Sequence, residues 1–213
     1  MTEAANIDIR YGRTPDRKIT GDDAELVDQF RHGDSEAMEK LILKYQHRIF
    51  NVILKICADP DDAAELSQET FVKIIENIDK FEGRSRFYTW AFRVAVNLTL
   101  NYCQRKAKLT LSSLDAEKDQ YNNQQIQVLK EFLSDESSPD PEMVAQNKEL
   151  CELAAQALMK LDEAQRAVVV LRDIEGMDYA QIADVLDIEL GTVRSRLSRA
   201  RGRLRKILEA GLL

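Results

Sequence analysis

The sequence predicts an all-α protein made of two small helical domains joined by an acidic flexible linker. Apolar residues recur at spacings of three and four through most of its 213 residues, and no segment alternates apolar and polar residues long enough for a sheet. Only eight glycines and four prolines interrupt these patterns. Between about residues 108 and 141 the periodicity gives way to Ser, Asp, Asn and Gln, and this linker separates the two halves.

Four helices are expected in the first domain, residues 22–107, after a loose polar tail over residues 1–21. The first helix follows a cap at residues 20–23 and ends near Gly33, and the second covers residues 35–56. Pro60 starts the third at about Asp61, where acidic residues face the positive end of the helix dipole. A fourth helix is expected over about residues 87–106.

The second domain, residues 142–213, is expected to hold four more helices. Apolar periodicity returns over residues 143–161, and Asp162 to Gln165 cap the next helix. Asp178 and Gln181 form a capping box for a short helix over residues 179–186, and residues 187–188 leave room only for a turn. A long basic helix follows, so the domain ends in a helix-turn-helix. The linker also allows a short helix around residues 125–133.

The basic helix carries the strongest signal in the chain. Seven of the sixteen residues from Gly191 to Lys206 are Arg or Lys and none is acidic, although the whole protein has a net charge of −7. On a helical wheel the apolar residues form one stripe, which we expect to be buried: Val193, Leu197, Ala200, Leu204, Ile207 and Leu208.

The opposite side of this helix holds Ser195, Ser198 and Gly202 between flanking arginines. Small residues let a helix approach another surface closely, and guanidinium groups reach phosphates or guanine edges, so the pattern predicts a helix that reads the major groove. The alternative is a solvated amphipathic helix whose arginines only provide solubility. The absence of acidic partners four residues away argues against it.

A second unusual segment lies at residues 81–102, where six aromatic side chains are interleaved with three arginines and flanked by Lys80, Arg105 and Lys106. Aromatic rings stack on unpaired bases while basic side chains follow the backbone, so the composition suits single-stranded nucleic acid. Some of the rings are expected to be core instead. On the wheel of the fourth helix, Ala91, Val94, Ala95, Leu98 and Tyr102 point inward, whereas a polar stripe points outward: Trp90, Arg93, Asn97, Asn101 and Gln104.

On the third helix, periodicity places an acidic face and two aliphatic residues, Leu66 and Val72, outside. The residues expected inside are Ala64, Phe71, Ile74, Ile75 and Ile78. Acidic residues around exposed aliphatics suggest a protein-docking surface, and a merely solvated acidic face is the alternative that periodicity leaves open.

Other functional classes find little support. Cys57, Cys103 and Cys151 are isolated, and the two histidines lack partners at metal-ligand spacing, so we expect reduced thiols and neither a metal nor a cofactor. No phosphate-binding loop or nucleophile elbow is present, so no enzyme activity is expected. The N-terminal residues carry charges where a signal peptide needs an apolar core, and no apolar run could span a bilayer, so a cytoplasmic protein is expected.

Three segments together resemble the extracytoplasmic-function sigma factors of bacterial RNA polymerase, which retain only sigma domains 2 and 4. They are AELSQETFVKII (residues 64–75), FEGRSRFYTWAFRVAVNLTLNY (residues 81–102) and DYAQIADVLDIELGTVRSRLSRAR (residues 178–201). The resemblance implies that residues 22–107 form sigma domain 2, which binds core polymerase and the minus-10 element. Residues 142–213 correspond to domain 4, whose helix-turn-helix binds the minus-35 element.

The resemblance also implies roles for particular residues. The expected minus-35 surface consists of Arg194, Ser195, Arg196, Ser198, Arg199, Arg201 and Arg203, of which the resemblance matches Arg194, Ser195, Ser198 and Arg199 to the readers of the family. The expected minus-10 surface consists of Phe81, Arg84, Arg86, Tyr88, Trp90, Arg93, Asn97 and Asn101, and the resemblance matches the loop of residues 81–86, Trp90 and Asn97 to positions that open the element and capture a flipped base. The expected polymerase dock consists of Asp62, Glu65, Leu66, Gln68, Glu69 and Val72, of which the resemblance matches Glu65, Gln68 and Glu69 to the docking residues of the family. Ser198 departs from members that carry a bulky aromatic there, so the minus-35 preference does not carry over.

The expected partners are therefore core polymerase and promoter DNA, duplex at minus-35 and single-stranded at minus-10. Members of the class often also have an anti-sigma protein. Two rivals stay open: a stand-alone helix-turn-helix regulator that binds duplex DNA without polymerase, and an RNA-binding adaptor. In the sigma reading, the acidic linker and the net charge oppose DNA binding by the free chain, and polymerase makes two weak DNA surfaces act together.

Overall fold

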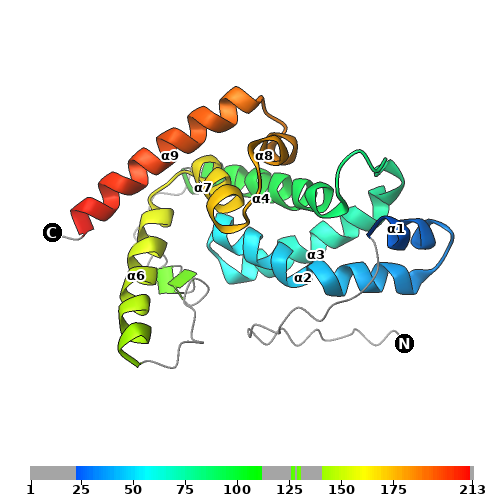
Figure 1. Ribbon diagram of the computed structural model, residues 1–213, viewed down its shortest axis with the longest axis horizontal. Helices are drawn as coiled ribbons and strands as arrows, with labels where there is room; N and C mark the ends of the chain where they lie inside the picture. The colour runs from blue at the N-terminus through cyan, green and yellow to red at the C-terminus, as the bar shows by residue number, and fades with distance from the viewer. Residues whose placement is uncertain (1–22, 112–125, 128, 131–140, 212–213) are drawn as a thin grey trace.

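The computed structural model describes residues 23–111, 126, 127, 129, 130 and 141–211, and this part of the chain is built from helices without a strand (Figure 1). The N-terminal lobe consists of α1 (Asp23–Arg31), α2 (Ser35–Cys57), α3 (Pro60–Asn77), the 3₁₀ turn η1 (Ile78–Lys80) and α4 (Phe87–Leu111). Helix α4 therefore continues past its expected end near Lys106. Most of the expected linker and the N-terminal tail lie outside the described residues.

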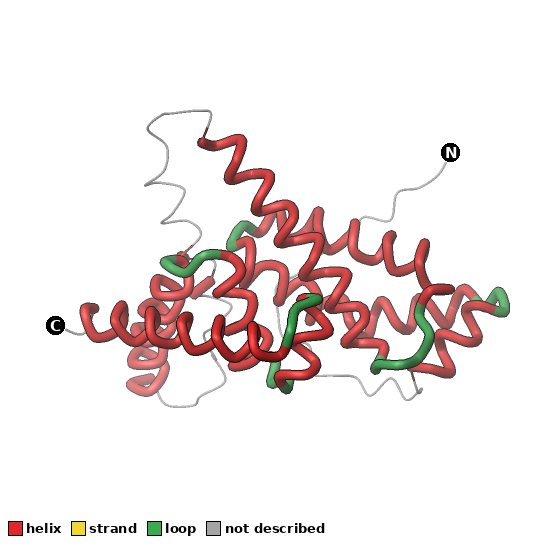
Figure 2. Tube along the Cα trace, turned by 90° about the horizontal axis from the view of Figure 1, so that it is seen from above, coloured by secondary structure: helices red, strands yellow, loops and turns green. Residues whose placement is uncertain are grey.

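The C-terminal lobe consists of α6 (Pro141–Met159), α7 (Glu163–Val169), a short π-helical segment η2 (Val170–Ile174), α8 (Tyr179–Leu186) and α9 (Leu190–Gly211). In Figure 2, viewed from above, α9 runs along one side of the molecule toward the C-terminus. Within the short helix allowed at residues 125–133, the described residues 126, 127, 129 and 130 are helical. The predicted all-α class with two helical halves is confirmed.

Acidic caps fix where several helices begin. Asp34 accepts a hydrogen bond from the Glu36 amide at the start of α2, and Asp59 accepts from two amides at the start of α3. Asp162 caps α7, and the predicted capping box of Asp178 and Gln181 is present at α8. Each cap satisfies amides that the first helical turn cannot pair, so these short polar positions set the helix boundaries.

The core of the N-terminal lobe differs from the wheel of the fourth helix. Phe92, Val96 and Thr99 of α4 are buried, whereas Val94 and Leu98 are only partly buried. Thr99 satisfies its hydroxyl by donating to the Ala95 carbonyl at 2.8 Å. Helix α4 is contacted by α2 and α3 on one side and by α7 and α8 on another, so one inward stripe cannot describe it.

The two lobes pack together. Helix α8 lies against α4 and α7 lies against α2 (Figure 1). Buried side chains of both lobes form one continuous hydrophobic cluster. The sequence predicted two lobes with a linker but gave no sign that they share a core, because a periodic apolar stripe does not say which helix will cover it.

Candidate nucleic-acid interface

Helix α9 is held by its predicted buried stripe and presents its basic side to solvent. Val193, Leu197 and Ala200 are buried, whereas Leu204, Ile207 and Leu208 of the expected stripe are only partly buried. On the other side, the exposed residues are Arg194, Ser195, Ser198, Arg199 and Gly202. The turn before α9 is tight because Asp187 adopts a left-handed conformation with φ of 53°, which aspartate tolerates better than most residues. This short turn fixes α9 against α8 in a helix-turn-helix.

The exposed side of α9 is organised by local contacts. Ser195 donates its hydroxyl to the Thr192 carbonyl at 3.0 Å, and Arg199 Nε donates to the Ser195 carbonyl at 3.2 Å. Arg201 forms a two-pronged ion pair with Asp173 of η2, and this hydrogen bonding raises the pKa of the Arg201 guanidinium. A hollow of about 440 Å³ follows this side, lined by Tyr179, Arg194, Leu197, Ser198, Arg201, Gly202 and Arg205.

The seven expected minus-35 residues do not all share one surface. Arg196 is partly buried, and Arg203 lines a separate hollow against α6 together with Lys160 and Lys206. The surface opposite the buried stripe is therefore narrower than the run of arginines suggested. Arg205, which the helical wheel places beside Arg194 although it is not among the seven expected minus-35 residues, lines the same hollow as Arg194.

The aromatic segment divides into buried and accessible rings. Phe81 is 6% exposed and Phe87 is also buried, with ring centroids 5.8 Å apart in an edge-to-face arrangement. Phe81 is thus one of the rings that belong to the core, where it packs against Trp90 with the ring centroids 5.5 Å apart. Trp90 is partly exposed on this aromatic base, so its ring is both accessible and firmly supported.

The expected cations and amides before and after Trp90 in the sequence differ in their exposure. Arg84 and Arg86 are exposed in the loop before α4, where Arg84 pairs with Glu82. Asn101 is exposed and Asn97 is partly buried. Gly83 in this loop has a φ of 72°, a conformation that favours glycine and lets the chain reverse before α4.

Two expected minus-10 residues on α4 contact the C-terminal lobe. Arg93 forms ion pairs with Asp184 and Asp187 at 3.2 Å each, and the Tyr88 hydroxyl accepts a hydrogen bond from Gln181. These contacts could not be predicted from the local pattern, because the partners lie more than ninety residues away.

On α3, the exposed acidic face is confirmed for Glu65, Gln68 and Glu69. Val72 is 52% exposed as expected, but Leu66 is 3% exposed and packs in the core, so the prediction of an exposed Leu66 is wrong. Ile75, which the wheel placed inside, is 40% exposed beside this face. The aliphatic pair within the acidic face is therefore Val72 and Ile75, which are neighbours at a spacing of three.

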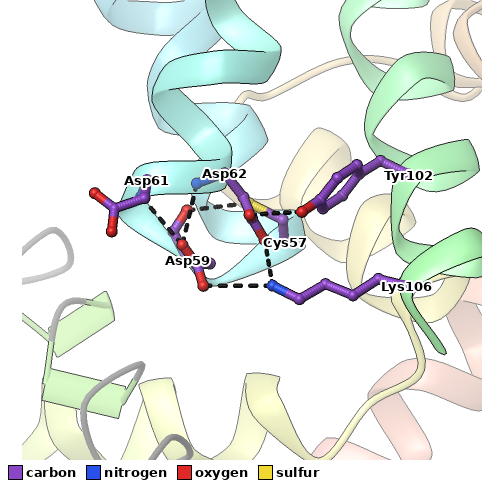
Figure 3. A network of polar contacts seen from close by, with 6 residues as sticks. All are labelled: Cys57, Asp59, Asp61, Asp62, Tyr102 and Lys106. Atoms are coloured by element: carbon purple, nitrogen blue, oxygen red, sulfur yellow. Dashed lines mark hydrogen bonds and ion pairs between the residues drawn. The ribbon is translucent and has the colours of Figure 1, made fainter. Parts of the chain in front are cut away.

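Asp62 lies apart from this exposed face, in a polar network that joins the start of α3 to the end of α4 (Figure 3). Its carboxylate is 15% exposed and accepts hydrogen bonds from the Tyr102 hydroxyl and from Lys106 Nζ, both at 2.6 Å. Lys106 also pairs with the N-cap Asp59 at 3.5 Å. The hydrogen bond to Asp62, together with burial, raises the pKa of Tyr102 to about 12. Asp62 is thus engaged within the lobe.

The thiols in this region are poor nucleophiles. Burial raises the pKa of Cys57 to about 12 and that of Cys103 to about 11, so both remain protonated at neutral pH. Among the described residues, no group of three or more His, Cys, Asp or Glu side chains is placed to hold a metal ion. No helix in the described ranges is long and apolar enough to cross a membrane.

Comparison with known proteins assigns both lobes. The Sigma-70 region 2 family model matches residues 41–109, and the Sigma-70 region 4 family model matches residues 151–204. The RNA polymerase sigma-H factor of Pseudomonas aeruginosa is 33% identical over 187 residues, which cover 88% of this chain and 94% of that protein. The ECF RNA polymerase sigma-E factor of Escherichia coli K12 is 32% identical over 183 residues, covering 84% and 90% of the two chains.

Two solved structures share the fold. One is CnrH in complex with the cytosolic domain of CnrY, with a TM-score of 0.60 and 23% identity, covering 89% of this chain and 99% of that chain. The other is the sigma factor RpoE of Bartonella quintana in complex with the anti-sigma factor NepR, with a TM-score of 0.59 and 20% identity, covering 80% and 96%.

Proposed function

The chain belongs to the extracytoplasmic-function sigma factors, the promoter-specificity factors of bacterial RNA polymerase, and from this premise we propose which helix contacts which partner. Helix α9 reads the duplex minus-35 element, α4 and the loop before it open the minus-10 element, and α3 docks on core polymerase. The family regulates transcription rather than catalysing a reaction, and action together with polymerase implies a cytoplasmic protein.

The minus-35 assignment is carried by one observation: the exposed side of α9 is lined with arginines around a strip of small residues. Ser195, Ser198 and Gly202 allow close approach to the base edges, and Arg194 and Arg199 flank this strip. Guanidinium groups pair with the O6 and N7 atoms of guanine and with phosphates, which suits this surface to a major groove.

The minus-10 assignment rests on the combination of Trp90, the loop arginines and the amides of α4. The ring of Trp90 is partly exposed above Phe81 and Phe87, a rigid support for stacking on an unpaired base. Asn97 and Asn101 follow Trp90 at spacings of seven and eleven, so they extend along the same side of the helix. An amide can both donate to and accept from a base that has left its stack.

The docking assignment rests on the exposed face of α3. Glu65, Gln68 and Glu69 surround the exposed aliphatics Val72 and Ile75, which matches the apolar centre and polar rim of protein interfaces. Leu66 and Asp62 support this face from inside the lobe. By the family resemblance, its partner is the clamp helices of the largest polymerase subunit.

Association with purified core polymerase tests the docking assignment. We expect Glu65→Lys with Glu69→Lys to weaken binding by more than tenfold while helicity and melting temperature stay unchanged, because both side chains are exposed. The matched control is Glu36→Lys with Glu39→Lys, which makes the same charge change on exposed positions of α2. Equal affinities of the two double variants would refute the dock on α3.

Transcription by the reconstituted holoenzyme from a library with randomised minus-35 and minus-10 elements tests the DNA assignments. Selected promoters that depend on both elements and on core polymerase support the proposal. Tight duplex binding without polymerase would favour a stand-alone regulator, and preferential binding to single-stranded RNA would favour an adaptor.

An anti-sigma protein is a further proposed partner. The two solved structures described above are complexes with a second protein, which is named as an anti-sigma factor in the Bartonella quintana structure. Co-purification of the tagged full-length chain from its native cells, with and without the charge changes on α3, would identify such a partner.

A further inference from the structure

The loop of residues 81–86 joins η1 to α4, carries the two exposed arginines of the proposed minus-10 surface, and has little support of its own. Most of its residues are exposed, and Gly83 adopts a positive φ of 72°. The chain enters the loop from the single turn of η1, where the Phe81 amide donates to the Ile78 carbonyl at 3.1 Å. Hydrogen bonds of a 3₁₀ turn have poorer geometry than those of an α-helix, so the position of this loop depends on contacts from elsewhere.

Arg31, the last residue of α1, supplies such a contact. Its Nη2 atom donates to the carbonyl of Ile78 at 2.6 Å and also to the carbonyl of Phe81, so one nitrogen joins both ends of the η1 turn. Helix ends leave carbonyls without intrahelical partners, and a charged donor forms a stronger hydrogen bond than a neutral one. Arg31 therefore fixes the point at which the loop begins.

The ion pair of Arg31 with Asp79 contributes much less. Arg31 Nε lies 3.9 Å from Asp79 Oδ1, and the side chain of Asp79 is 89% exposed. Water and salt screen an exposed pair at this distance, so it contributes little. The hydrogen bonds to the two carbonyls are the contacts through which Arg31 acts on the loop.

Phe81 connects this anchor to Trp90. Its carbonyl accepts from Arg31, while its buried ring lies 5.5 Å from the ring of Trp90 and 5.8 Å from that of Phe87. Phe87 and Trp90 are themselves 5.9 Å apart, so the three rings contact one another. Because buried side chains are closely packed, a shift of the Phe81 backbone moves the ring that supports Trp90. One side chain of α1 thus bears on both the loop and the Trp90 ring.

We propose that Arg31 is a positioning residue for capture of the unpaired minus-10 base: it holds the Ile78 and Phe81 carbonyls, and through them the loop and the Trp90 ring, in the arrangement that receives the base. The inference rests on the proposed role of α4 and its preceding loop. It gives a task to α1, which lies before residue 41, where the match to the Sigma-70 region 2 model begins. Arg31 acts without touching DNA, because both hydrogens of Nη2 are used by the two carbonyls.

The expected size of the effect follows from the contact that a displaced loop loses. One hydrogen bond between a side chain and a base changes an equilibrium by about twofold to tenfold. Removing the donors of Arg31 should therefore lower the preference for the captured base by about the same factor. The affinities for core polymerase and for duplex minus-35 DNA should stay unchanged, because Arg31 lies on neither α3 nor α9.

Trp90 provides a direct reading of its own position, because it is the only tryptophan in the sequence. The wavelength of tryptophan emission and its quenching by acrylamide report how far the ring is exposed to water. Methionine in place of Arg31 keeps an apolar stem but supplies no donor. We expect Arg31→Met in the free full-length chain to shift Trp90 emission to longer wavelength and to increase its quenching. This reading needs neither polymerase nor DNA.

Three further variants separate the hydrogen bonds from charge. Arg31→Lys keeps the charge and an ammonium donor, so it should restore part of the wild-type emission and base preference. Lys40→Met removes a positive charge from an exposed position of α2 and should leave both readings unchanged. Asp79→Asn removes only the exposed ion pair and should also be neutral. All emission is measured below the melting transitions, so folded proteins are compared; if Arg31→Met does not fold, Arg31→Lys is compared with the wild-type chain.

Base preference is measured by transcription with the reconstituted holoenzyme from a library with a randomised minus-10 element. Unchanged emission and unchanged preference in the Arg31 variants would overturn the proposal, and a lower melting temperature alone would show a purely structural role. Altered emission with unchanged preference would overturn the role in base capture.

A uniform loss of affinity for all minus-10 sequences, with a smaller salt slope and unchanged emission, would also overturn the proposal, because Arg31 would then contact a phosphate. Failure of the proposed function is distinguished by the separate core-polymerase assay. A chain that never binds core polymerase is not the proposed sigma factor, whereas Trp90 emission still reports whether Arg31 holds the ring in place.

Discussion

Replacing Arg166 by methionine should destabilise the whole molecule, because this buried guanidinium satisfies carbonyls in both lobes. Arg166 is 5% exposed and donates to the carbonyls of Leu158 at 3.1 Å, Leu161 at 3.1 Å and Ile56 at 2.7 Å. Burial lowers the pKa of this guanidinium. Methionine keeps the apolar stem but supplies no donor, so three carbonyls lose a charged partner.

The magnitude follows from opposing contributions. A hydrogen bond to a charged group contributes about 1.5–3 kcal/mol, so three of them give roughly 4.5–9 kcal/mol. Relief from burying a guanidinium offsets several kcal/mol of this sum. We expect a net loss of about 3–5 kcal/mol in the free energy of unfolding, which at about 2–4 °C per kcal/mol lowers the melting temperature by roughly 6–20 °C.

Urea unfolding and calorimetry measure this loss, with Arg203→Met as the matched control. Arg203 is exposed, so the same exchange there should change the free energy by no more than about 0.5 kcal/mol. A change below about 1 kcal/mol for Arg166→Met would refute the reasoning, since the carbonyls would then have found other partners at little cost.

Three further outcomes are expected. Arg199→Ala should cost about 1–3 kcal/mol of discrimination at one minus-35 base pair, whereas Arg205→Ala should weaken binding to all sequences alike and reduce the salt slope by about one unit. Binding to a minus-35 library at several salt concentrations measures both effects. A uniform, salt-dependent loss of affinity for Arg199→Ala would show that Arg199 contacts a phosphate and not a base. Asn97→Ala should reduce promoter opening and relax preference at one minus-10 base with duplex minus-35 binding unchanged, and normal permanganate reactivity with unchanged preference would contradict this. The raised pKa of Tyr102 predicts that its contribution to the free energy of unfolding is fully present below pH 10 and falls between about pH 10 and 12, because the unfolded chain loses the phenolic proton first. Urea unfolding of Tyr102→Phe should show a smaller fall in stability over this range. Parallel curves for the two proteins would rule out the hydrogen bond between Tyr102 and Asp62 as the source of the fall.

Local signals predicted the helices and the exposed basic side of α9 well. The capping box of Asp178 and Gln181 and the buried stripe of α9 depend on neighbours within a few residues, and the structure contains both. Periodicity failed where a helix is contacted from several directions. Leu66 was expected outside and is buried, while Ile75 was expected inside and is exposed, because packing against α2 and α4 rotates the buried side of α3 away from the simple apolar stripe.

Long-range contacts could not be predicted at all. Arg93 was expected on an exposed polar stripe, and its partners Asp184 and Asp187 belong to another lobe. Nothing in the sequence near α4 identifies a helix more than ninety residues later as its cover. The same limit applies to Arg166, whose helical position gives no sign that it donates to a carbonyl of α2.

The network around Asp62 has a consequence for how docking and strand opening are related. Asp62 and Asp59 at the start of α3 bind Tyr102 and Lys106 near the end of α4 (Figure 3), so the two helices are joined where no loop connects them. In the proposed function α3 is the polymerase-binding helix and α4 carries Trp90. Polymerase that binds α3 therefore also positions α4 and the Trp90 ring. The aromatic surface is then already in place in the assembled holoenzyme before promoter DNA binds to it.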